Sequence, residues 1–317
     1  MSADTSPPEL PFTGERFIPG TRGEIWIEHW HRYHFAARWS AGKRVLDIAC
    51  GEGYGSALLA RGAAHVTGVD ISPDAVKHAR HAYAGVGNLE FREGSCTRIP
   101  LPDASVELAV SFETVEHIEA QEGFLEELAR VLVPGGVLLL SCPNRLEYSD
   151  KRGFANEFHV RELYRDELDA LVRSRFPHAD WYAQRPTFYS LIAPERPAPW
   201  AGQLVEVDEA DPEDASASLS SPLYFLVAAS REPAALAPVS PALSVLADRD
   251  DWVYRDYEKV MKDLNHHAAL NRTLEARLAE RESELARERG ERDRERAGYR
   301  SWRWWLRLPL LRMGLLK

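Results

Sequence analysis

Residues 45–70 constrain the fold of this chain more than any other part of the sequence. Val45–Ala49 is a short apolar run with one polar interruption, as expected of an interior strand of a parallel sheet. Three glycines follow at alternate positions, Gly51, Gly53 and Gly55. They let the main chain turn sharply, and they let a ligand approach backbone atoms without a Cβ in between. A short helical segment, residues 56–61, then leads to a second apolar strand, Val66–Asp70, which ends in a carboxylate.

An acid at the tip of a second strand can accept hydrogen bonds from both hydroxyls of a ribose, so Asp70 predicts a nucleoside site. The G-x-G-x-G spacing differs from the G-x-G-x-x-G of dinucleotide enzymes. Together with Asp47 inside the first strand, V-L-D-I-A-C-G-E-G resembles the first motif of class I S-adenosylmethionine-dependent methyltransferases of the type 11 kind. Ala49 stands where that family usually has glycine. A glycine-rich turn without cofactor and a nicotinamide dehydrogenase are the alternatives.

Features further along the chain agree with this resemblance. Ser72 and Pro73 are a helix start, and L-x-P-G-G at residues 132–136 precedes an apolar strand. The resemblance implies an α/β fold, a Rossmann-like seven-stranded class I methyltransferase domain, with S-adenosyl-L-methionine as cofactor. The predicted strands are residues 45–49, 66–70, 89–92, 106–112, 137–141, 181–184 and 223–229. The implied cofactor-binding residues in this domain are Asp47, Gly51, Gly53, Asp70, Ile71, Ser95, Cys96, Phe112 and Glu113.

Two segments before the glycine motif, Phe12–Pro19 and Glu28–Tyr33, resemble a branch of the family associated with bacterial O-antigen and surface-polysaccharide synthesis. In that branch the N-terminal segment covers the cofactor. The resemblance implies that an arginine there pairs with the methionyl carboxylate, Arg32 before Arg16. A surface helix whose arginines face water is the alternative. His29, His31 and His34 have ligand-like spacing, but no second ligand cluster accompanies them, so we expect no metal.

Methyl transfer to a hydroxyl is an in-line attack on the sulfonium methyl, helped by a base that takes the hydroxyl proton. Histidine suits that task. His117 follows the strand at 106–112, and His159 lies in a segment, N-E-F-H-V-R-E, that resembles one found in glycan and quinone methyltransferases. Both are predicted catalytic residues, and a packed or capping histidine is the alternative for each. Glu113 and Glu116 could instead orient the acceptor or the cofactor's amino group.

Composition narrows the class of acceptor. The net charge is −10, and the last 22 residues contribute +6, so the remainder carries −16 and is a poor binder of nucleic acid. The three cysteines, Cys50, Cys96 and Cys142, show neither metal-binding nor disulfide spacing. The sequence shows no signal peptide and no stretch long enough to span a bilayer, so we expect a cytoplasmic protein.

The C-terminal part has a different character. Apolar residues recur in alternating steps of three and four, the pattern of a heptad seam, and Asn271 at an a position favours a two-stranded pairing. We therefore predict a coiled coil that forms a homodimer or binds a partner helix, with a single exposed helix as the alternative. The final segment mixes tryptophan, leucine and arginine, which predicts contact with an anionic membrane at the inner face of the plasma membrane. A packing arm that docks on the protein is the alternative.

These observations divide the chain into five parts. They are an N-terminal cofactor-covering segment, 1–40, the methyltransferase domain, 41–232, an Ala/Pro linker, 233–244, the coiled coil, 245–297, and the basic aromatic tail, 298–317. The predicted function is O-methylation of a sugar of a bacterial surface glycan. A methyltransferase for a quinone or another small lipid-like acceptor is one alternative. A non-catalytic scaffold that senses the cofactor and recruits partners through its coiled coil is another.

Overall fold

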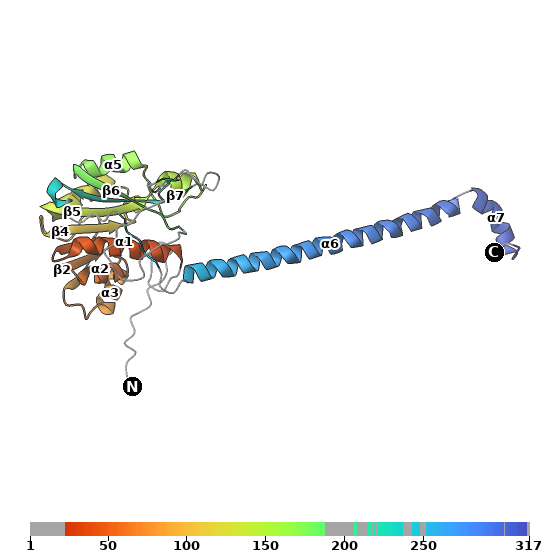
Figure 1. The fold of residues 1–317 in the computed structure, drawn as a ribbon, viewed down its shortest axis with the longest axis horizontal. Coiled ribbons are helices and arrows are strands. Elements are labelled where there is room, and N and C mark those ends of the chain that lie inside the picture. The colour runs from red at the N-terminus through yellow and green to blue at the C-terminus, as the bar shows by residue number, and fades with distance from the viewer. Residues whose placement is uncertain are drawn as a thin grey trace, which may run out of the picture. The chain divides into compact units, whose positions relative to one another are not determined.

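The computed structural model describes residues 23–187, 206–207, 215–216, 219, 221–236, 243–247, 252–300 and 302–315 (Figure 1). The chain divides into two compact units, Met1–Asp248 and Arg249–Lys317. The strands are β1 Arg44–Ile48, β2 His65–Asp70, β3 Leu89–Glu93, β4 Val106–Phe112, β5 Leu132–Pro143, β6 His178–Gln184, β7 Glu206–Val207, β8 Ala215–Ser216 and β9 Tyr224–Ser230. The α-helices are α1 Glu24–Ser40, α2 Tyr54–Ala60, α3 Pro73–Ala82, α4 Gln121–Val131, α5 Arg165–Arg173, α6 Trp252–Arg300 and α7 Trp302–Arg312.

Seven strands form one sheet in the order β3-β2-β1-β4-β5-β9-β6, which confirms the predicted seven-stranded α/β sheet. Strand β9 runs antiparallel to both of its neighbours, β5 and β6, whereas the pairs on the other side are parallel. β1 and β4 are direct neighbours although β2 and β3 intervene in sequence. The strand order therefore reverses between them, and in open α/β sheets the crevice at such a point, at the carboxyl ends of the strands, is where ligands bind.

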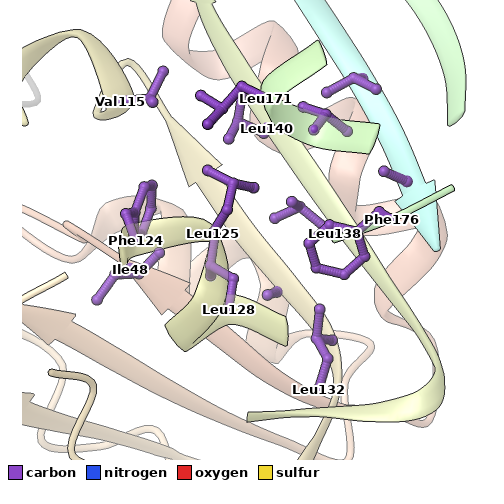
Figure 2. Close-up of a cluster of buried hydrophobic side chains, with 14 of the residues drawn as sticks. Ile48, Val115, Phe124, Leu125, Leu128, Leu132, Leu138, Leu140, Leu171 and Phe176 are labelled. Carbon is purple, nitrogen blue, oxygen red and sulfur yellow. The ribbon is translucent and has the colours of Figure 1, made fainter. Parts of the chain in front are cut away.

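Helices cover both faces of the sheet. On one face the apolar stripe of α4, formed by Phe124, Leu125 and Leu128, packs on Ile48 and Leu138 in the larger core (Figure 2). Helix α5 adds to the same core through buried leucine and valine side chains. On the other face α1 and α2 pack against alternate residues of the same strands, and α3 packs on β2 and β3. The inner strands of the sheet are thus buried on both sides, which explains their continuous apolar runs, whereas the edge strands β3 and β6 are partly exposed.

Most predicted boundaries agree with the structure within two residues. The predicted helix start is confirmed, since the hydroxyl of Ser72 accepts a hydrogen bond from Ala75 N at 3.3 Å. Two boundaries are wrong. Strand β6 begins at His178, three residues before the predicted start at 181, because its antiparallel pairing with β9 continues as far as Ser230. Strand β5 begins at Leu132, five residues before the predicted start at 137, so the P-G-G motif lies inside the strand. Leu132 pairs with Val106 across an irregularity in the register, and this pairing extends the ladder where a turn was expected.

The C-terminal unit contains the long helix α6 and the shorter α7, which has Pro309 in its interior. At 1.5 Å per residue, the 49 residues of α6 extend about 74 Å. Its seam residues are exposed, among them Val260, Leu264, Leu274, Leu278 and Leu285. The pairing of this helix in a coiled coil stays a prediction. Within the part of the chain that is described, none of the helices is both long and apolar enough to cross a membrane.

Candidate functional site

The glycine-rich loop after β1 is built from left-handed backbone. Gly51 and Gly53 have φ values of 57° and 97°, and a Cβ on Gly53 would lie 2.8 Å from the ring of Phe91. The carboxylate of Asp70 closes the loop, accepting hydrogen bonds from Gly51 N at 2.9 Å and from Ser72 N at 2.8 Å. A carboxylate has about four acceptor positions, so these two bonds do not by themselves exclude hydrogen bonds to ribose hydroxyls. The predicted Gly51, Gly53 and Asp70 therefore lie together at the carboxyl edge of the sheet.

Asp47 lies behind this loop. Its side chain is buried, and it accepts hydrogen bonds from the hydroxyls of Ser56 at 2.5 Å and Tyr33 at 3.1 Å. Burial raises the pKa of this carboxyl to about 7, although both hydrogen bonds oppose the shift. These bonds join strand β1 to helices α1 and α2. Asp47 therefore acts on the predicted cofactor site by positioning the glycine loop.

Arg32 of α1 is 1% exposed, and two of its guanidinium nitrogens lack hydrogen-bond partners among the described residues. Its Nε donates to Oε1 of Gln184 at 2.7 Å, and the guanidinium lies 4.4 Å from the ring centre of Tyr224. Its Nη2 also lies 3.5 Å from Oε1 of Glu113. Buried guanidinium groups normally use their N–H donors. Among the described residues Nη1 has no hydrogen-bond partner and Nη2 has only the ion pair with Glu113, so the guanidinium suits a further anionic ligand such as a carboxylate.

Phe112 and Glu113 stand at the end of β4, beside β1. Glu113 has a φ of 50°, a strained conformation for a residue with a side chain, and such strain concentrates at functional sites. The hydroxyl of Ser141 donates to its carboxylate at 2.6 Å. The ring of Phe112 meets Tyr33 edge to face at 5.2 Å. Both predicted residues thus border the crevice between β1 and β4, next to Arg32.

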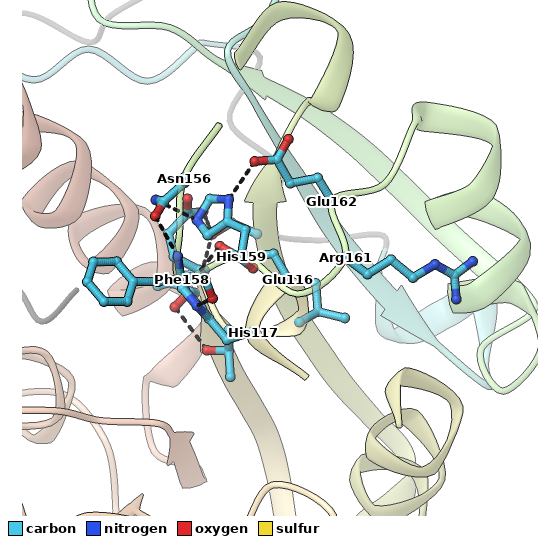
Figure 3. Close-up of polar contacts among 12 residues, drawn as sticks. Glu116, His117, Asn156, Phe158, His159, Arg161 and Glu162 are labelled. Atoms are coloured by element: carbon cyan, nitrogen blue, oxygen red, sulfur yellow. Dashed lines mark hydrogen bonds and ion pairs between the residues drawn. The ribbon is translucent and has the colours of Figure 1, made fainter. Parts of the chain in front are cut away.

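The two predicted catalytic histidines, 42 residues apart in sequence, lie together (Figure 3). The main-chain N–H groups of Val160 and Arg161 donate to the carbonyl oxygen of Glu116 at 2.9 and 3.0 Å, which docks the later segment on the turn after β4. The rings of His117 and His159 then meet edge to face at 4.9 Å. Sequence spacing alone could not show this contact, because it depends on a hydrogen-bonded crossing between two loops.

Each ring of this pair has a defined partner. His117 Nδ1 lies 3.0 Å from the carbonyl oxygen of Phe158, and His159 Nδ1 lies 2.6 Å from Oε1 of Glu162. The amide nitrogen of Asn156 lies 3.0 Å from His159 Nε2. Glu116 is 1% exposed, and neither of its carboxyl oxygens has a hydrogen-bond partner within the described part of the chain. Burial raises the pKa of Glu116 well above its usual range, and the nearby charge of Glu113 adds to the shift.

The remaining predicted residues are more peripheral. Ile71 is 72% exposed directly after Asp70, an apolar surface beside the predicted ribose position. Ser95 bonds to the hydroxyl of Thr97 at 3.0 Å, and Cys96 packs against the larger core. Arg16 lies outside the described residues, as does most of the acidic segment between β6 and β9.

The histidines of α1 do not form a cluster. His29 Nδ1 lies 3.0 Å from the hydroxyl of Tyr54, and His31 Nε2 lies 3.0 Å from the hydroxyl of Ser244. Sequence reasoning missed Gln184 and Tyr224, the partners of Arg32, which come from strands more than 150 residues further along the chain. No local motif marks either of them.

Residues 46–140 match the model of a family described as a methyltransferase domain. The seven-stranded sheet is also similar to that of solved structures. A chain in the complex between the Trm112 methyltransferase activator and a methyltransferase of Haloferax volcanii shares this fold, with a TM-score of 0.50 and 21% identity. That similarity covers 65% of this chain and 92% of the other.

Curated relatives agree with the predicted enzyme class and cofactor. A probable S-adenosylmethionine-dependent methyltransferase of Mycolicibacterium smegmatis is 43% identical over 174 residues, which are 53% of this chain and 65% of the relative. A protein of the same description from Mycobacterium tuberculosis is 43% identical over 180 residues, 54% of this chain and 63% of its own. The chain thus spans a little under two thirds of the length of these relatives. A demethylmenaquinone methyltransferase of Clavibacter sepedonicus is 39% identical over 101 residues, 32% of this chain and 41% of that protein.

Proposed function

We propose that this protein transfers a methyl group from S-adenosylmethionine to a hydroxyl of a small-molecule acceptor. The observation that carries the proposal is the buried guanidinium of Arg32, which has N–H donors without hydrogen-bond partners among the described residues and so suits the methionyl carboxylate. In this arrangement Asp70 binds the ribose, and Gly51 and Gly53 supply the left-handed backbone of the loop that Asp70 closes. Glu113 and the two histidines are the residues that we expect to lie near the transferred methyl group.

The reaction needs little from the protein beyond alignment and removal of one proton. The acceptor oxygen attacks the methyl carbon as the carbon–sulfur bond breaks, and the electron pair of that bond stays on sulfur. The hydroxyl proton leaves at the cluster of Glu116, His117 and His159, where the histidines are the candidate bases. Holding oxygen, methyl and sulfur in line supplies most of the rate enhancement.

Binding measurements with two nucleosides test the cofactor assignment. 5′-Methylthioadenosine has the ribose and adenine of S-adenosylmethionine but lacks the amino-acid part. We expect Arg32→Lys to weaken S-adenosylmethionine binding about tenfold or more and to leave methylthioadenosine binding unchanged, since a charge-assisted hydrogen bond is worth about 1.5–3 kcal/mol. We expect Asp70→Ala to weaken both by similar factors, and the exposed Asp74→Ala to weaken neither. Unchanged affinities for Asp70→Ala would overturn the assignment.

For the acceptor we favour a sugar of a bacterial surface glycan. The groups around the expected methyl position are polar, because two carboxylates, two histidines and the Asn156 amide gather there. Such a lining suits an acceptor with several hydroxyls. The resemblance of the segments at 12–19 and 28–33 to enzymes of surface-polysaccharide synthesis supports the same class.

A quinone or other lipid-like acceptor is the second candidate. One relative is named a demethylmenaquinone methyltransferase, and another, from Synechocystis, a 2-methyl-6-phytyl-1,4-hydroquinone methyltransferase. The ring of exposed Phe154 meets Tyr148 edge to face at 5.9 Å, and the ring of Tyr148 stacks on His159 at 5.5 Å, so apolar surface does lie beside the cluster. Formation of S-adenosylhomocysteine with glycan fragments and with quinone precursors separates the two classes. Absence of turnover with either class, at intact cofactor affinity, would favour the cofactor-sensing scaffold.

The tail is proposed to hold the protein at the cytoplasmic face of the membrane. Exposed Trp305, Leu306 and Leu310 of α7 lie among arginines, and each cation near an anionic surface adds about 1 kcal/mol. Deleting residues 298–317 should move the protein from the membrane fraction to the soluble fraction. An unchanged distribution would exclude this anchor.

A further inference from the structure

The carboxyl group of Glu116 is buried, and no hydrogen bond from the described residues offsets the cost of burying it. It is 1% exposed, and neither oxygen has a hydrogen-bond partner among the described residues. Burial of an unpaired carboxylate is costly, and proteins usually offset it with a hydrogen bond, a cation or a metal ion. Arg32, the buried cation nearby, directs its terminal nitrogen to Glu113 rather than to Glu116. His117 Nε2 lies 3.9 Å from Oε1, beyond hydrogen-bond distance, so within the described part of the chain no hydrogen bond offsets the burial of Glu116.

Two imidazole rings face the same space as Glu116 (Figure 3). One potential ligand atom from each of Glu116, His117 and His159 lies within 4.8 Å of the other two. That spacing suits three atoms around a single ion, since ligand-to-metal distances near 2 Å allow separations of about 3–4 Å after small side-chain shifts. Both rings come from loops joined by backbone hydrogen bonds to the carbonyl of Glu116, so the three side chains are placed as a unit.

The outer contacts of the rings are those of metal-binding histidines. His117 Nδ1 lies 3.0 Å from the Phe158 carbonyl oxygen, and His159 Nδ1 lies 2.6 Å from the carboxylate of Glu162. Such partners accept the Nδ1 proton and direct Nε2 toward a metal. His117 Nε2 does face Glu116, at 3.9 Å from Oε1. His159 Nε2 accepts from Asn156 in this structure, so a metal would take over the lone pair that the Asn156 amide now uses.

We infer that Glu116, His117 and His159 bind a divalent cation. Two imidazole nitrogens and one carboxylate oxygen suit Zn²⁺, Co²⁺ or Mn²⁺ better than Mg²⁺ or Ca²⁺, which prefer all-oxygen sites. Three protein ligands leave at least one coordination position open, as in catalytic rather than structural sites. His117 is 30% exposed, so the open position is accessible from solvent.

The role of the cation rests on the proposed function. The open position would take the acceptor hydroxyl oxygen, and coordination lowers the pKa of such a hydroxyl. With the cation bound, the two histidines would serve as its ligands, and solvent water would take the hydroxyl proton in place of the histidine base of the metal-free site. Sequence analysis singled out the two histidines and Glu116 separately but gave no sign that their atoms converge.

Titration of the full-length, chelator-treated protein with Co²⁺ tests the site directly. We expect one Co²⁺ per chain, with the visible ligand-field absorption of a low-coordinate nitrogen and oxygen site. Glu116→Gln and His159→Ala should each lose this absorption. Glu162→Gln changes the partner of His159 Nδ1 and should weaken Co²⁺ binding about tenfold or more. His65→Ala is the matched control, because His65 lies on β2 and pairs with Glu90, away from the cluster. Near-UV circular dichroism of each variant verifies that it is folded.

The outcomes separate this inference from the proposed function. Absence of Co²⁺ binding by the folded parent protein, or equal binding by folded Glu116→Gln, would overturn the metal site. S-adenosylmethionine affinity is measured on the same samples, and we expect it to be the same with and without Co²⁺. Loss of metal binding in Glu116→Gln at unchanged cofactor affinity supports the site. Failure to bind S-adenosylmethionine at all would count against the proposed function and leave the metal result standing.

Discussion

The hydroxyl of Tyr33 lies 3.1 Å from Oδ1 of Asp47, and this bond ties helix α1 to the first strand of the sheet. The ring of Tyr33 also packs directly over Gly55, the third glycine of the loop motif. The neighbouring Arg32 is thereby held with its guanidinium toward the end of β4. A helix that precedes the glycine motif in sequence is thus part of the same site.

Gly55→Ala should destabilise the domain. A Cβ at this position would overlap the ring of Tyr33, so either the ring or helix α2 must move. We expect a loss of about 1–3 kcal/mol in the free energy of unfolding, measured by urea denaturation. Gly62→Ala is the control, since its Cβ would be 3.7 Å from the nearest atom, an ordinary contact. Equal effects of the two changes would show that Tyr33 does not pack over Gly55 in solution.

Ala49→Gly should stabilise the domain. Ala49 has a φ of 60°, in the left-handed region that costs a residue with a Cβ about 1–2 kcal/mol. Glycine removes this strain but loses more entropy on folding, so we expect a net gain of about 0.5–1 kcal/mol. The same substitution at exposed Ala82, the last residue of helix α3, relieves no such strain and should not stabilise the domain. Thermal denaturation gives the sign of the stability change for each substitution. A loss of stability in Ala49→Gly would contradict the backbone strain at Ala49.

Glu28 should make stability depend on pH. Its buried carboxyl accepts from the Tyr224 hydroxyl at 3.0 Å, and burial raises its pKa to about 7 against the attraction of Arg32. The folded protein therefore holds this proton more tightly than the unfolded chain does. The resulting contribution to stability is present below about pH 4.5 and is lost as pH rises through about 7.

Glu28→Gln removes this dependence and keeps an acceptor for Tyr224. We expect the free energy of unfolding of the variant, relative to the parent, to rise by up to about 3 kcal/mol between pH 4.5 and 7.5. Urea denaturation at a series of pH values measures the difference. Glu24→Gln changes an exposed residue on the same helix and should leave it constant. If the difference in unfolding free energy between Glu28→Gln and the parent does not change with pH, the pKa of Glu28 lies in its usual range.

The seam of α6 predicts self-association or a partner helix. Leu264 and Leu278 are 59% and 61% exposed on the helix described by itself, and apolar side chains at heptad positions pack when helices pair. If the pairing is between copies, sedimentation equilibrium should give a dimer, and Leu264→Lys with Leu278→Lys should give a monomer. Lysines at Ala269 and Ala276, off the seam, should leave the dimer intact. If the parent protein is monomeric at high concentration, self-association through this seam is excluded, and only binding of a partner helix from another protein remains.

Local features of the sequence predicted much of the fold. The strands are short apolar runs, Ser72 is a helix N-cap, and the glycines occupy backbone that favours glycine. Asp70 was predictable for the same reason, because the end of a strand and the start of a helix are both visible in sequence. The early start of β5 was not, since it depends on pairing with Val106 in a neighbouring strand.

The sequence by itself determined the class of fold, the cofactor motif and the residue types available for chemistry, because each depends on contacts between near neighbours in the chain. The tertiary structure decided which of these side chains meet. It seats Arg32 between Gln184 and Tyr224, and it brings Glu116 to His159 through hydrogen bonds between two loops. These contacts follow from strand order and loop docking, which join residues too far apart for any local pattern to record.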